Sequence, residues 1–398
     1  MEISLEKPIF KKKELTVAST RNISEIQFVL TELLYVPDER LKLVIVLELV
    51  DYFTEKFSEP DYKIRFFYAT QDGILTGFVI CQIDGDYKSY GMSCPTFGWL
   101  HTKNFLSCKK LMNECENFVR ENKKKKLRGP INYPKFVGGI GFQTEGFEAP
   151  MMSGVAFGDP ESKVLEYLQQ LGYKKDSKYM CLDTFLKKWD KGKNLDENIA
   201  VRFLPLDEIR DLKEQIMGLA SQSLYAVLAD APGGRARFEE MMDGYAQARK
   251  VLKLVGEEFP QDYAGVPGFR ETWESCDLKK IVPMAIFGFD RNTNELVGVI
   301  MCQPNLFQLW NGEQLTHLNV DTVMIKKEYA GKGIFSALHN IGVFLSSSSY
   351  GFNYYEGTTI WANNDRAIKT IFPHGTPTRT HYVVQKRLHK ELKVNIKF

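Results

Sequence analysis

VDTVMIKKEYAGKGIFSAL, residues Val320–Leu338, is the stretch that decides the fold. Its apolar start is typical of a strand, Gly331 and Gly333 lie in a short polar loop, and a helix is predicted to begin directly after them. Such a loop presents backbone N–H groups and a helix N-terminus to an anion, and glycine lets a phosphate approach the backbone closely. The spacing fits neither a P-loop nor a dinucleotide-binding fingerprint.

The same order of predicted elements occurs on both sides of a polar, charged segment at 187–199. Each side reads as a strand, one or two helices, three strands, a helix, a strand, a helix and a closing strand. We therefore predict two copies of one α/β (α+β) fold, residues 1–186 and 200–398, with 187–199 as the linker. The second copy contains a helical insertion at about 221–280, for which a lid, a dimer contact and a brace between the halves are all open interpretations.

Charge and apolar patterning exclude several classes of partner. The chain has 398 residues and a formal net charge of +2, so we expect no nucleic-acid partner. Its most apolar stretch, Leu41–Val50, is about half the ~20 residues of a membrane span, and the N-terminus lacks a secretory signal. The seven cysteines form no CxxC pair and are predicted to be free, buried thiols. We expect a cytoplasmic protein that does not contact membranes.

The stretch at 320–338 closely resembles the acetyl-CoA-binding motif of the GNAT superfamily of N-acetyltransferases, in which a hydrophobic strand leads into [RQ]-x-x-G-x-[GA]. Here these six positions are Ala330 to Phe335, AGKGIF, and the downstream WANNDRA at 361–367 resembles that family's step from its fifth strand to the next helix. The resemblance covers 200 to about 388, with the inserted segment set aside. With RGPINY at 128–133, TEGFEAP at 144–150 and YLQQLGYKK at 167–175, most of the chain also resembles a group of uncharacterised bacterial N-acetyltransferase-like proteins. It implies tandem GNAT folds, each a mixed, mostly antiparallel sheet flanked by helices.

The resemblance also implies acetyl-CoA or another acyl-CoA as co-substrate, with the acyl group transferred to a small-molecule amine by direct attack in a ternary complex. In that family the fourth and fifth strands separate and the pantetheine arm lies between them. The residues implied to hold the cofactor are Val323, Met324, Ile325, Gly331, Lys332, Gly333, Ile334, Phe335, Ser336 and Asn364. Ala330, Phe335 and Ile371 depart from the family pattern, which motivates the alternative of a non-catalytic protein that binds acyl-CoA or another ligand.

Direct transfer to an amine needs a base that accepts a proton from the attacking nitrogen. Alternate residues of a strand share a face, and on the strand before the glycine loop these are His317, Asn319, Asp321 and Val323. Asp321 and His317 are our catalytic candidates, although structural hydrogen-bond networks use the same residue types. His374 and Tyr382 are weaker alternatives. The six histidines show no metal-ligand spacing, so no metal site is expected.

The first half lacks the glycine loop, since residues 99–105 read WLHTKNF at the corresponding place. We do not expect this half to bind acyl-CoA in the usual manner. It carries RGPINY at 128–133, glycines at 138–141 and TEGFEAP at 144–150, which predict a long loop at the end of a strand, where ligands often bind. The alternative is that the loop only crosses the sheet edge. The candidate substrate-binding residues are Arg128, Asn132, Tyr133 and Glu145.

Overall fold

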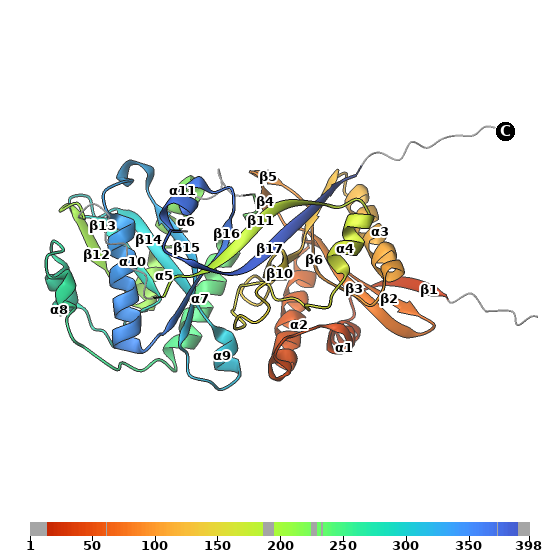
Figure 1. Cartoon of the computed structure of the whole chain (residues 1–398), viewed down its shortest axis with the longest axis horizontal. Helices are drawn as coiled ribbons and strands as arrows, with labels where there is room; N and C mark the ends of the chain where they lie inside the picture. The colour runs from red at the N-terminus through yellow and green to blue at the C-terminus, as the bar shows by residue number, and fades with distance from the viewer. Residues whose placement is uncertain are drawn as a thin grey trace, which may run out of the picture.

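Two groups of helices and strands lie side by side and are joined by long strands that cross the middle of the molecule (Figure 1). This computed structural model describes residues 14–60, 62–185, 195–223, 229–231, 234–371 and 373–388. Most of the predicted linker therefore lies outside the described residues. Among those described, no helix is long and apolar enough to cross a membrane. The mixed α/β architecture expected from the sequence is confirmed.

The first half contains two helices before its first hairpin and one long helix after its fourth long strand. Its main elements are β1 (Leu15–Thr20), α1 (Ile23–Leu33), α2 (Lys42–Ser58), β2 (Lys63–Gln71), β3 (Ile74–Ile83), β6 (Thr96–Thr102), α3 (Phe105–Glu121), β7 (Lys126–Gly129), α4 (Val164–Gln170) and β11 (Lys174–Asp183). Short pieces lie between them, namely η1 (Glu39–Leu41), β4 (Lys88–Ser89), β5 (Met92–Ser93), β8 (Ile131–Asn132), β9 (Gly139–Ile140) and β10 (Phe142–Glu145).

The second half repeats this order around the inserted helices. Its elements are β12 (Ile199–Arg202), α5 (Leu206–Asp211), α6 (Lys213–Ser223), α7 (Arg235–Arg249), η2 (Gln261–Tyr263), α8 (Phe269–Ser275), β13 (Ala285–Asp290), β14 (Leu296–Pro304), α9 (Leu306–Trp310), β15 (His317–Ile325), η3 (Lys327–Tyr329), α10 (Ile334–Phe344), η4 (Leu345–Ser349), β16 (Tyr354–Trp361), α11 (Asp365–Thr370) and β17 (Thr376–Arg387).

Local sequence signals set several of these boundaries. The side chain of Asn22 accepts hydrogen bonds from the first backbone N–H groups of α1, and Asn104 caps α3 in the same way through Ser107 N. The β2–β3 hairpin turns at Asp72 and Gly73, whose φ angles are 54° and 81°. Two positive φ values match the right-handed twist of the flanking strands, and Asp-Gly is a preferred pair for such turns.

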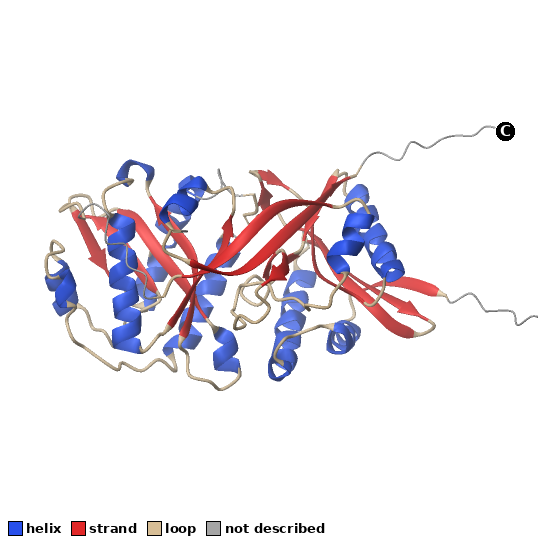
Figure 2. Ribbon diagram, in the orientation of Figure 1, coloured by secondary structure: helices blue, strands red, loops and turns tan. Residues whose placement is uncertain are grey.

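The long strands of both halves form one sheet, in which the closing strand of each half pairs with the other half, while β4–β5 and β8–β9 form two small separate sheets. Its order is β1-β2-β3-β6-β7-β17-β11-β16-β15-β14-β13-β12, with β10 beside β17. β11 comes from the first half yet pairs with β16, while β17 comes from the second half and pairs with β7. These two long strands cross the middle of the molecule antiparallel to each other (Figure 2). The sequence predicted two copies but not this exchange.

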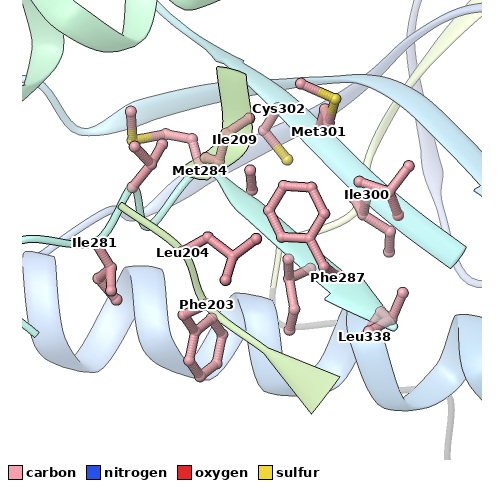
Figure 3. Close-up of a cluster of buried hydrophobic side chains, with 14 of the residues drawn as sticks. Phe203, Leu204, Ile209, Ile281, Met284, Phe287, Ile300, Met301, Cys302 and Leu338 are labelled. Atoms are coloured by element: carbon pink, nitrogen blue, oxygen red, sulfur yellow. The ribbon is translucent and has the colours of Figure 1, made fainter. Parts of the chain in front are cut away.

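The second half has an extensive apolar core between its sheet and α10 (Figure 3). Phe287 on β13 and Leu338 on α10 are fully buried there. Gly298 on β14 permits the close packing, because a Cβ at this position would lie 2.8 Å from Ile334 Cγ2. This contact fixes the first turn of α10 against the sheet. All seven cysteines are free and six are buried, as predicted, with Cys276 partly exposed.

Candidate active site

The parallel strands β15 and β16 separate part-way along their length. They pair from His317 opposite Tyr354 to Val320 opposite Gly357, and there the pairing ends. Past this point β15 stays paired with β14 on its other side, so its edge toward β16 is left without a strand partner. The register of β15 against β14 shifts directly after Val320, as a bulge does. A bulge adds local twist, which turns the two strands apart.

A cavity of about 270 Å³ lies where the strands separate. Its walls come from residues 320–324 of β15 and 357–361 of β16, and α10 contributes Phe335 and His339. Asn364 and Ile371 line it from the segment around α11, and the first half contributes Lys135. The implied cofactor residues Val323, Met324, Phe335 and Asn364 therefore meet at this cavity together with Asp321. The edge of β15 gives an extended ligand a row of backbone groups to pair with, as a further strand would.

The glycine loop continues from β15 to the N-terminus of α10. Gly331 and Gly333 have φ angles of 79° and 76°, a region that glycine enters without strain. Gly333 is the N-cap of α10 and offers no side chain to the first N–H groups of the helix. A Cβ at Gly331 would meet no atom within 4 Å, so the turn is open on that side. The loop therefore has the geometry that an anion such as a pyrophosphate requires.

The remaining implied cofactor residues surround this loop rather than the cavity. Ile334 is buried under the sheet and anchors the turn. Lys332 forms an ion pair with Asp196 at 3.5 Å and lies over the Tyr329 ring at 4.6 Å. Ser336 is in the first turn of α10, and Ile325 ends β15. These residues do not line the cavity themselves.

Asp321 lies at the cavity between two cationic side chains. Its Oδ1 atom is 2.9 Å from Lys135 Nζ and 3.0 Å from Arg237 Nη2, and the Thr322 hydroxyl donates to its Oδ2. Burial alone would raise the pKa of Asp321, but Arg237 and Lys135 outweigh burial and hold that pKa well below the usual range. Asp321 is therefore a stable anion and a poor proton acceptor. Lys135 comes from the first half and Arg237 from the insertion, so three parts of the chain meet here.

His317 lies at the beginning of β15 and does not line the cavity. Its ring packs against Tyr354 at 4.8 Å, and its Nδ1 atom is within hydrogen-bond distance of the Thr316 hydroxyl and the Gln308 side chain. Burial lowers its pKa. The extra residue after Val320 resets the alternation of side chains, so sequence spacing cannot place His317 and Val323 on one face. The structure brings Asp321 to the cavity but not His317.

The four candidate substrate-binding residues do not converge on one place. Arg128 is fully buried and donates from Nε and Nη2 to the two carboxylate oxygens of Asp230, at 2.6 and 2.7 Å. Asn132 is buried and accepts a hydrogen bond from Trp99 N. Glu145 is exposed on β10. Tyr133 lines a second cleft, described below.

Comparison with known proteins supports this architecture. No family model and no curated protein matches the chain. Among solved structures, a tandem GNAT protein from the clavulanic acid biosynthesis pathway aligns with a TM-score of 0.53 and 9% identity, over 94% of this chain and 98% of that one. The chain has a tandem GNAT fold. A probable N-acyltransferase from Enterococcus faecalis and a GCN5-related N-acetyltransferase from Anabaena variabilis each give a TM-score of 0.49, at 10% and 9% identity, over 95% of this chain and 73% of theirs.

Within this tandem GNAT fold, three residues at the cavity were not among the sequence candidates: Lys135, Arg237 and His339. Lys135 follows the RGPINY segment, and Arg237 lies on α7 in the insertion. His339 is one turn after Phe335 and stacks on it at 5.8 Å. The predicted glycine loop marks the beginning of α10. Because residues four apart on a helix share a face, the predicted cofactor residue Phe335 could have indicated His339. Lys135 and Arg237 reach the cavity only through contacts between distant parts of the chain.

Proposed function

We propose that this protein is an acyl-CoA-dependent N-acyltransferase that transfers an acyl group, acetyl from acetyl-CoA being the expected case, to a primary amine in a ternary complex. One observation carries the proposal: the separated strands β15 and β16 form a cavity, and a glycine loop at the end of β15 leads to the uncapped N-terminus of α10. A strand edge and an anion-binding turn in continuous sequence suit a long thioester with a pyrophosphate. The tandem GNAT fold supports the same class of reaction.

Residues on both sides of the cavity have separate roles in this proposal. When bound, acyl-CoA supplies a thioester: the amine nitrogen forms a C–N bond, the C–S bond breaks, and the proton lost by nitrogen is balanced by protonation of the leaving thiolate to a thiol. The edge of β15 at Val323 and Met324 would hold the pantetheine arm, and residues 331–336 would hold the pyrophosphate through backbone N–H groups. Phe335 would narrow the cavity beside the acyl group.

The amine must lose a proton as it attacks, and Asp321 accepts protons poorly because its pKa is lowered. We assign to Asp321 the role of holding Lys135 and Arg237 in place at the cavity wall. Our candidate for the proton transfer is Glu240, which lines the adjoining cleft described below, and that cleft shares Arg237 with the cavity. It forms an ion pair with Arg237 at 3.0 Å, and burial raises its pKa toward the range of an effective base.

The alternative function is binding without catalysis. The low proton affinity of Asp321 and the apolar Ile371 in the cavity wall favour it. Acetyl transfer to any member of a panel of primary amines, measured by release of free thiol, would exclude this alternative. Acetyl-CoA binding without turnover on the whole panel would favour it.

Isothermal titration with acetyl-CoA tests the proposed function directly. We expect saturable binding in the micromolar range, and Gly333→Val should abolish it, because a side chain at a positive φ distorts the turn that faces the anion. Gly73→Ala is the matched control, since Gly73 has a similar φ of 81° in a hairpin of the first half. Absence of binding at high micromolar acetyl-CoA, or equal binding by both variants, would contradict the proposal.

A further inference from the structure

A second cleft, of about 720 Å³, lies between the two halves and has α2 on one side and α7 on the other. The two helices stand near the junction of the halves in Figure 1. Lys135 and Arg237 line both this cleft and the cavity between β15 and β16. The cleft therefore adjoins the cavity at these two side chains, on the side of the first half and away from the glycine loop.

Negative charge dominates the walls of this cleft. Nine carboxylates line it against three basic side chains, and each of those three is already ion-paired with a carboxylate. Five of the nine form no ion pair with any described residue, namely Glu48, Asp51, Asp84, Asp86 and Asp243. Burial raises the pKa of Glu48, and the neighbouring Asp51 raises it further. Burial likewise raises the pKa of Asp84, whereas Asp51, Asp86 and Asp243 are exposed, so a bound cation would stabilise the ionised forms of Glu48 and Asp84 most.

Three tyrosines give the cleft a place for ammonium groups. Tyr52 and Tyr133 stack with ring centroids 6.5 Å apart, and the hydroxyls of Tyr52 and Tyr62 are 3.0 Å apart. The ammonium of Lys56 lies 5.2 Å from the centroid of the Tyr62 ring while it pairs with Glu59 at 2.7 Å. The wall thus already holds one primary ammonium between an aromatic face and a carboxylate, an arrangement that stabilises cations.

The hydroxyl of Tyr133 gives an independent sign of a missing partner. This side chain is about nine-tenths buried and lines the cleft near Asp84. Its hydroxyl forms no hydrogen bond of ordinary geometry to any described residue, and the nearby Asp84 carboxylate interacts with it as an acceptor. Asp84 can take only the proton of this hydroxyl, so the described residues leave the oxygen without a donor group beside it.

We propose that this cleft binds the acceptor amine, and that the acceptor is an oligoamine with two or more ammonium groups along a flexible chain. This inference rests on the proposed acyltransferase function. One terminal amine would reach the Asp321 cluster while the remaining ammonium groups lie among the unpaired carboxylates and tyrosines. A bound metal ion fits less well, because no three potential ligands converge at one point among the described residues.

Calorimetric titration with spermidine, a linear triamine, tests the inference without acyl-CoA. We expect saturable binding that is at least about tenfold tighter than that of n-butylamine, which carries one charge, because each additional ammonium finds a carboxylate partner. The preference should weaken as salt rises from low to physiological concentration. Equal affinity for the two amines would overturn the inference.

A matched pair of variants locates the site. The triple variant Glu48→Gln, Asp51→Asn, Asp243→Asn removes three unpaired charges from the cleft and should weaken spermidine binding about tenfold or more. The control Glu121→Gln, Asp211→Asn, Glu271→Gln removes three exposed charges elsewhere and should leave the affinity unchanged. If the cleft variant and the control variant lose the same spermidine affinity, the attraction is non-specific and the inference is overturned. If the triple variant does not fold, Tyr133→Phe is the second test, and we expect it to weaken spermidine binding about fivefold.

The two proposals fail in different ways. A chain that binds acetyl-CoA but not spermidine would overturn this inference alone. A chain that binds spermidine but not acetyl-CoA would overturn the proposed function and leave the cleft as an oligoamine site.

Discussion

Single residues at the junction of the halves show how charge is balanced inside the protein. Asp321 forms ion pairs with two cations from different segments, and removing it leaves, among the described residues, Lys135 without a carboxylate and Arg237 with Glu240 alone. We predict that Asp321→Asn lowers the free energy of unfolding by about 3–5 kcal/mol, the usual effect of an uncompensated buried charge. Lys135→Met leaves the Asp321–Arg237 pair intact and should change stability by no more than about 1 kcal/mol. Urea unfolding of both variants measures the contrast, and equal losses would contradict it.

The contribution of Asp321 to the free energy of unfolding depends on pH in a direction that follows from its lowered pKa. Because the folded pKa of Asp321 is lowered, its contribution to stability is complete above the unfolded carboxyl pKa and is lost as pH falls toward the folded value. The stability difference between the natural chain and Asp321→Asn should therefore be constant from pH 8 to pH 5. It should shrink only below about pH 4. A difference that already declines between pH 7 and pH 5 would show that Asp321 is not held as an anion by its neighbours.

Among the elements, the fourth long strand of each half is bulged, but the described chain fills the space between the fourth and fifth strands in the first half and leaves it open in the second. In the first half β6 and β7 pair at a single position, Thr96 with Arg128. The following segment lies in the gap, where Asn132 accepts a hydrogen bond from Trp99 N and the carbonyl of Ile131 approaches Gly98. The first half's own chain thus occupies the place that the cavity leaves open in the second half.

This difference predicts the stoichiometry of cofactor binding. Titration with acetyl-CoA should give one site per chain, because the N–H of Trp99 is already bonded and no glycine loop follows β6. The alternative is a second site in the cavity of about 780 Å³ beside β6, which is large enough for part of a cofactor. Two equivalent sites per chain, or one site that survives Gly333→Val, would contradict it.

Local patterns predicted most elements because they depend on neighbouring residues. The hairpin at Asp72-Gly73, the glycine loop before α10 and the alternation of strands and helices are all set by contacts a few residues apart. Arrangements that depend on a distant segment could not be predicted in this way. The bulge after Val320 interrupts the alternation used for His317, and Arg128 pairs with Asp230 of the insertion. Asp321 lies beside the cavity as its strand and loop suggest, whereas Lys135 and Arg237 reach the cavity from distant segments.

At the scale of the whole molecule, the two halves are held together by exchanged strands and by the insertion. β17 lies between β7 and β11, and β11 lies between β17 and β16, so each half supplies a central strand to the other. The buried Arg128–Asp230 pair joins β7 to the insertion. Of the three interpretations of the insertion, these contacts are those of a brace. The arrangement also fixes the cleft and the cavity relative to each other, since Lys135 and Arg237 approach Asp321 from opposite sides of the junction.

Strand exchange predicts that the halves unfold together. Separating them would expose the long edges of β7 and β16 and remove buried apolar surface from both cores, so neither half is expected to be stable alone. Calorimetry of the full chain should show one cooperative transition. A protease site introduced at residue 190, within the predicted linker, supplies the control: after complete cleavage the two pieces should still elute together in gel filtration and melt within a few degrees of the intact chain. Two separate transitions, or dissociation of the pieces in the absence of denaturant, would show that the halves are independent domains connected by the linker alone.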